Sequence, residues 1–82
     1  MHGTMIFESI SDSLKEICQE KEIRTLKKVH LTVNPASNIT KDNLKEELRI
    51  SMPSIATENV QIIVDNMKNI NKYAVINSIE GE

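Results

Sequence analysis

The chain has 82 residues, of which 39% are hydrophobic and 27% are charged, a balance that excludes an intrinsically disordered chain. A chain of this length holds one modest core, so we expect a single domain over residues 1–82. Ten basic and twelve acidic residues give a net charge of −2 without a basic cluster, and one Phe and one Tyr are the only aromatic residues, which argues against nucleic-acid binding.

The first predicted element is an amphipathic helix over about residues 4–21. Its apolar residues recur at three- and four-residue spacing between polar ones: Ile6, Ile10, Leu14, Ile17 and Cys18. We expect Gly3 or Thr4 to cap the start of this helix. Because Cys18 lies on the apolar face, we interpret it as a small buried hydrophobe and not as a metal or redox residue.

A strand is predicted next, over residues 27–33. Val29, Leu31 and Val33 alternate with polar residues, which is typical of a strand with one buried face. His30 falls on the opposite phase, so we expect a solvated or helix-covered histidine in preference to a metal ligand. Residues 34–38 have the composition of a loop.

The second predicted helix covers residues 41–51, where Leu44 and Leu48 are one turn apart. Thr40 is expected to cap its start, because the hydroxyl can accept a hydrogen bond from a free amide of the first turn. Pro53 closes the helix, since proline cannot continue it.

Two strands are predicted at the end of the chain, over about residues 60–65 and 73–79. The segment between them is polar and rich in Asn, which predicts a hairpin. The expected fold is therefore α+β, in the order α-β-α-β-β, with two helices packed on one face of a small three-stranded sheet. We expect one core, formed by Leu14, Val29, Leu31, Leu48 and Ile62.

The sequence also limits the location of the protein and the kind of site it can hold. No apolar run reaches the length of a membrane span, and the first residues lack the pattern of a secretory signal, so we expect a cytoplasmic protein without membrane contact. The single Cys18 agrees, because one thiol cannot form an internal disulfide. Zinc sites made of four Cys, or of two Cys and two His, are excluded as well.

Several segments together resemble one known family. Met1-His2 stands directly before the first helix, and residues 27–48, 55–65 and 72–82 (ending in Ser78-Ile79-Glu80) follow in order. These features resemble the HypA/HybF family, the nickel insertion factors for nickel–iron hydrogenase and sometimes urease. The chain departs from the family pattern in two ways. It lacks the inserted zinc module with its two Cys-x-x-Cys pairs, and Gly3 replaces the glutamate that follows His2.

The resemblance implies a nickel metallochaperone or maturation accessory and not an enzyme. The implied Ni(II) donors are the terminal amine of Met1, the His2 imidazole and local backbone amides, including that of Gly3. The implied partners are a HypB-like GTPase and a hydrogenase large subunit, and the missing module implies that no zinc is bound.

The chemistry of the amino terminus supports this hypothesis independently. A free amine, the next amide and the imidazole of residue 2 can close fused chelate rings, and nitrogen ligands in a tetragonal arrangement suit Ni(II).

The second helix carries three acidic residues, Asp42, Glu46 and Glu47. We interpret them as a solvated helix face and not as an acid–base site, because the sequence shows no nucleophile to accompany them. The alternative function is a protein-interaction or dimerisation module, including a homodimer, that keeps the fold but has lost metal binding.

Overall fold

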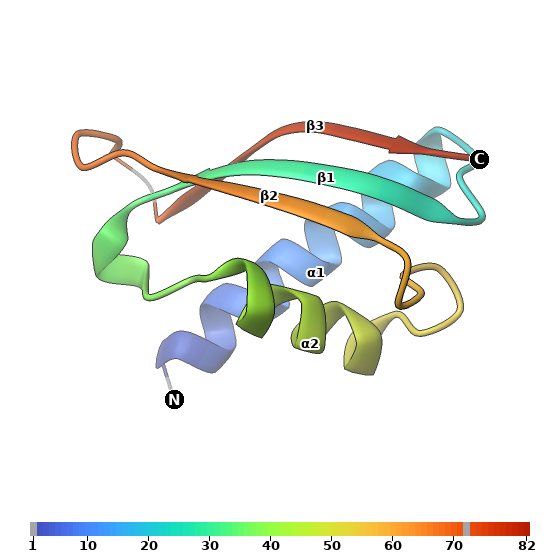
Figure 1. Ribbon diagram of the computed structural model, residues 1–82, viewed down its shortest axis with the longest axis horizontal. Coiled ribbons are helices and arrows are strands. Elements are labelled where there is room, and N and C mark those ends of the chain that lie inside the picture. Colours follow the sequence, from blue (N-terminus) through green and yellow to red (C-terminus); the bar gives the residue numbers. More distant parts are fainter. Residues whose placement is uncertain (1, 72) are drawn as a thin grey trace.

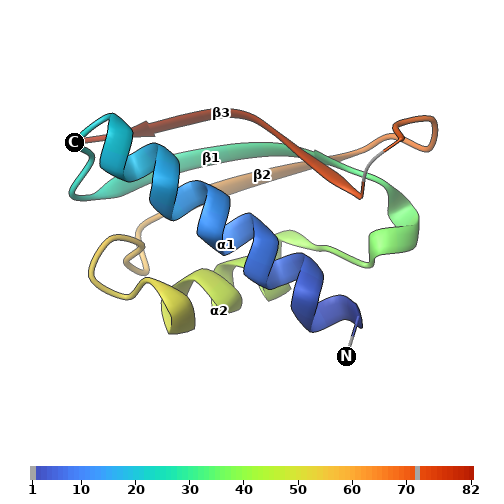
Figure 2. The same ribbon diagram turned by 180° about the vertical axis from the view of Figure 1, so that it is seen from behind.

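The computed structural model describes the backbone of residues 2–71 and 73–82, and the side chains of residues 8–71 and 73–82. The elements are α1 (His2–Glu20), β1 (Leu26–Val33), the short 3-10 helix η1 (Pro35–Ser37), α2 (Lys41–Ser51), β2 (Gln61–Asn66) and β3 (Ala74–Gly81). Both helices lie on one face of a three-stranded sheet, and the other face is uncovered by helices (Figures 1 and 2). The predicted α+β class and the order α-β-α-β-β are therefore confirmed.

The strand order is β2-β1-β3, so the predicted hairpin is wrong. β1 lies in the centre and pairs in parallel with β2 and antiparallel with β3. The loop after β2 crosses the end of β1: the Met67 N–H donates to the Val33 carbonyl (2.9 Å), and the Asn34 N–H donates to the Tyr73 carbonyl (2.8 Å). The outer strands of such a sheet are about 10 Å apart, a gap that this loop is long enough to span. β1 occupies the central position, and its alternating apolar residues are fully buried on the helix side.

The predicted core is confirmed. Buried side chains from both helices, β1 and β2 form one cluster that includes Leu14, Val29, Leu31, Leu48 and Ile62. β3 adds only partly buried residues to this cluster, which suits its place at an edge of the sheet. The two helices also meet through a polar contact, since the hydroxyls of Ser11 and Ser51 are hydrogen bonded at 3.0 Å.

Two irregularities in the β1–β3 pairing change which residues face the core. Between Leu26 and Lys28, β1 contains one residue more than β3, and opposite His30 and Leu31 the extra residue is Asn77 of β3. An extra residue of this kind is a β-bulge, and it shifts the alternation of side chains by one position. Ile76 and Ile79, three residues apart, can therefore both pack against the core. The last strand therefore does not keep a strict alternation of core-facing and solvent-facing residues.

The helix ends show one confirmed cap and one wrong start. Thr40 caps α2 as predicted: its Oγ1 accepts a hydrogen bond from the Asn43 N–H (3.1 Å), and the Thr40 N–H donates to Asn43 Oδ1 (2.8 Å). α1 begins at His2, before the expected caps at Gly3 and Thr4. Neither described helix is long and apolar enough to cross a membrane.

Candidate functional site

The start of α1 is the first candidate site. Met1 and the His2 side chain lie outside the described part of the structure, but the backbone of α1 is described from His2 onward. The amides of His2 and Gly3 belong to the first turn, where N–H groups have no acceptor within the helix. The start of α1 lies far from the sheet, at the end of the molecule that also carries η1 and the β2–β3 loop (Figures 1 and 2). Its backbone is thus placed at the periphery of the fold.

His30 lies on the uncovered face of the sheet, as its strand phase predicted. Its side chain is 32% exposed, and Nε2 lies 2.6 Å from Asp65 Oδ2 of β2. The sheet separates this imidazole from α1, so the structure does not bring His30 and His2 together. The pairing with Asp65 was not predicted, because it depends on the parallel register that places Asp65 beside Thr32. The available signal was that His30 and Asp65 both occupy the polar phase of their strands.

Other polar side chains of this face also pair across strands. Asn77 Nδ2 donates to Thr32 Oγ1 (2.6 Å), and Lys28 Nζ lies 3.7 Å from a Glu80 carboxylate oxygen. Exposed cross-strand pairs contribute only tenths of a kilocalorie per mole, up to about 1 kcal/mol each. The polar side chains around the His30–Asp65 pair are thus bonded to one another. The arrangement is that of a solvated sheet face.

Cys18 is buried on the core side of α1, as predicted. Its side chain is 1% exposed, and burial raises the pKa of the thiol. Since the thiolate is the form that binds metals and attacks electrophiles, a raised pKa makes this thiol less reactive. In contrast, Asp42 and Glu46 are exposed on α2, which agrees with the solvated helix face expected there, whereas Glu47 is half-buried.

No three His, Cys, Asp or Glu side chains within residues 8–71 and 73–82 gather closely enough to hold a metal ion. The predicted nickel ligands at Met1 and His2 are outside this range, and only the backbone of Gly3 is described. The ligand set at the amino terminus therefore stays a prediction.

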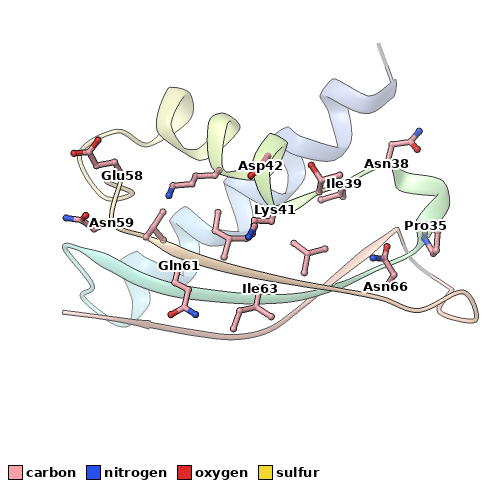
Figure 3. Close-up of a pocket in the computed structure, with 15 residues that line it drawn as sticks. Pro35, Asn38, Ile39, Lys41, Asp42, Glu58, Asn59, Gln61, Ile63 and Asn66 are labelled. Carbon is pink, nitrogen blue, oxygen red and sulfur yellow. The ribbon is translucent and has the colours of Figure 1, made fainter.

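A groove between α2 and β2 was not predicted. Its volume is about 1050 Å³, and its walls are the first turns of α2, the segment before β2, and β2 itself. Lys41 lies over its middle, whereas Glu58 and Pro35 lie at opposite ends (Figure 3). The groove exists because β2 is an edge strand, and the predicted hairpin gave no reason to expect β2 at an edge beside α2.

No known family model matches the chain, and a comparison with curated proteins finds no match either. The resemblance to the HypA/HybF family therefore depends on the segments quoted above.

Proposed function

We propose that the protein is a nickel metallochaperone or maturation accessory, which binds one Ni(II) ion at its amino terminus and passes it to a partner. The observation that carries this proposal is the pair Met1-His2 at the head of α1. The proposed donors are the Met1 amine, the His2 imidazole and the local backbone amides, including that of Gly3. Nickel is the cargo, and the protein catalyses no reaction.

The backbone at the start of α1 supports this donor set. Amides in the first turn of a helix have no acceptor within the helix, so coordination by the amides of His2 and Gly3 would cost no internal helix bond. Gly3 does not prevent this coordination, because the donors are backbone groups, but glycine makes the chelate less rigid since it has more conformational freedom to lose. The element order is also the one that the resemblance implies, with a short loop between β2 and β3 in place of the zinc module.

The proposed partners are a HypB-like GTPase and the large subunit of a hydrogenase, in the cytoplasm. The first turn of α1 lies at the far end of the helix layer from the sheet, where a partner could approach it (Figures 1 and 2). A carrier needs such a peripheral site because its ion must be released to another protein.

A nickel titration of tag-free protein by calorimetry tests the proposal. We expect one ion per chain at micromolar affinity, lost in His2→Ala and in protein whose amine is blocked by a tag. An α-amine and an imidazole ordinarily lose their protons near pH ~7.8 and ~6.5, so binding should release protons and strengthen from about pH 6 to 8. His30→Ala and Cys18→Ser are the matched controls and should bind normally. Binding that survives His2→Ala, or no binding at about pH 7.5, would refute the proposal.

The second candidate function is a metal-free protein-interaction or dimerisation module. It is favoured by large apolar side chains that face solvent: Ile50 (69% exposed), Tyr73 (57%), Met67 (49%) and Val75 (39%). Three of these four lie in the β2–β3 loop or at the start of β3. Sedimentation of the native protein at several concentrations would reveal a homodimer, and absence of nickel binding would leave this function in place of the carrier.

A further inference from the structure

The free edge of β2 lacks the bulges, prolines and lysines that often protect an edge strand. β2 pairs with β1 through six consecutive residues without a register shift, and its sequence QIIVDN contains no Pro, Gly or Lys. Natural proteins commonly block strand edges with bulges, lysines or prolines, because an open edge pairs with other chains. The opposite edge, β3, does carry a bulge at Asn77. The structure therefore leaves one regular edge open, and that edge is β2.

The backbone groups that face outward along this edge can be identified from the register. The Met67 N–H donates to the Val33 carbonyl, so residue 67 directs its backbone towards β1. The N–H and C=O groups of successive strand residues point alternately to the two edges of the strand. Gln61, Ile63 and Asp65 therefore face β1, and the alternate residues Ile62, Val64 and Asn66 present their N–H and C=O groups to the free edge.

The groove beside this edge has the shape of a site for one added strand. β2 forms one wall and the first turns of α2 form the other, with a volume of about 1050 Å³ between them (Figure 3). A strand that pairs with an edge lies about 4.8 Å from it, and six residues of it are about 20 Å long. An added strand would consequently lie along α2, with every second side chain directed towards the helix.

The helix wall of the groove carries two positive charges and one negative charge. Lys41 and Lys45 both line it, and neither is in an ion pair within the part of the chain that the structure describes. The two lysines are four residues apart on α2, which corresponds to about 6 Å along the helix. Alternate residues of a strand are roughly 6.7 Å apart. Two acidic side chains at alternate positions of an added strand would therefore match the two lysines. Asp42 adds one negative charge to this wall, and Glu58 lies at the end of the groove.

We propose that β2 and α2 form a peptide-binding groove, which takes an extended acidic segment of a partner protein as a fourth strand. Main-chain hydrogen bonds would come from Ile62, Val64 and Asn66, and selectivity for carboxylates from Lys41 and Lys45. A second copy of the chain fits this site less well. Symmetric pairing of two β2 edges would bring the two α2 helices together, with two lysines from each, and like charges opposite each other oppose association. The groove is separate from the amino terminus, so this inference rests on neither proposed function.

Amide hydrogen exchange of the full-length protein tests the position of the added strand. The probe is a short synthetic peptide in which Glu alternates with Thr, and the control peptide carries Lys in place of Glu. At saturation with the acidic peptide, exchange at the Ile62 and Val64 amides should slow at least about tenfold, while exchange at Ile63 stays unchanged. Unchanged exchange at Ile62 and Val64 would overturn the proposal. So would equal binding of the acidic and basic peptides.

Two variants test the two walls separately by fluorescence polarisation with the labelled acidic peptide. Lys41→Glu/Lys45→Glu should weaken binding about tenfold, since the attraction between each lysine and a carboxylate of the peptide becomes a repulsion. Asn66→Pro removes an N–H that faces the free edge, a change that edge strands tolerate, and should also weaken binding of the acidic peptide. Circular dichroism checks that both variants are folded, and Glu46→Lys on the exposed face of α2 is the control. Normal affinity in both variants would refute the proposal.

A second copy in the groove would show itself in the free protein. Protection of the Ile62 and Val64 amides that increases with protein concentration, together with a dimer in sedimentation, would assign the edge to self-association and overturn the peptide proposal. Nickel titration of the double lysine variant separates this inference from the carrier function. Normal nickel binding is expected there whether or not the peptide binds.

Discussion

Replacing Leu14 with Ala tests the packing of α1 on the sheet. Leu14 is completely buried and belongs to the cluster that joins both helices to β1 and β2. Removal of a buried leucine side chain loses its transfer free energy and leaves a cavity, which together cost about 2 to 5 kcal/mol. Small domains are stable by only about 5 to 15 kcal/mol. We therefore expect Leu14→Ala to remove a large fraction of the free energy of unfolding, and to lower the melting temperature by at least about 10 °C.

Urea unfolding followed by circular dichroism measures this loss. Ser13→Ala is the matched control, because Ser13 precedes Leu14 on the same helix but is exposed. Its free energy of unfolding should change by less than about 0.5 kcal/mol. A loss of less than about 0.5 kcal/mol in Leu14→Ala would show that this face of α1 does not pack on the sheet.

Three further measurements test other parts of the structure. In Gly81→Ala, the new Cβ would lie 2.5 Å from the Thr25 carbonyl oxygen and 2.6 Å from Ile23 Cγ2. We therefore expect thermal unfolding to show that the free energy of unfolding falls by about 1 to 3 kcal/mol. An unchanged melting temperature would contradict this contact. Burial raises the pKa of the Cys18 thiol, so the folded protein holds this proton more tightly than the unfolded chain. The thiol should thus leave the free energy of unfolding unchanged below about pH 8.5 and lower it as the pH rises above that value. Urea unfolding at several pH values would detect this decline, and Cys18→Ala should reduce it. Purified native protein should contain no stoichiometric zinc by elemental analysis, and a chelator should leave its circular dichroism unchanged, because one Cys and two His distant in sequence cannot supply four zinc ligands.

Local patterns in the sequence were sufficient to predict the elements and most of the core. α2 begins and ends at the predicted residues, because Thr40 marks its start and Pro53 prevents its continuation. The alternation of Val29, Leu31 and Val33 identified the buried face of β1. In both cases, the residues that allow the prediction lie within the predicted helix or strand or within two residues of its ends.

Apart from the start of α1, which lies at His2 before the expected caps, the errors concern contacts between residues that are far apart in sequence. A polar loop rich in Asn suits a tight hairpin and a crossing over β1 equally well, and only competition for the central place in the sheet decides between them. The His30–Asp65 contact and the groove beside β2 both follow from that strand order. The bulge at Asn77 was missed for a related reason, since it depends on the register of β3 against β1.

The position of His2 at the start of α1, far from the sheet, allows metal binding to be tested independently of folding (Figure 1). The described core begins at Ile10 on α1, two helical turns after His2. A substitution near a helix end and away from the core usually changes stability by less than about 0.5 kcal/mol. We therefore expect His2→Ala to unfold at the same urea concentration as the native protein while it loses nickel binding. If His2→Ala lowered both the free energy of unfolding and nickel binding, a structural role of His2 in α1 would explain the loss, and the carrier proposal would lose its principal support.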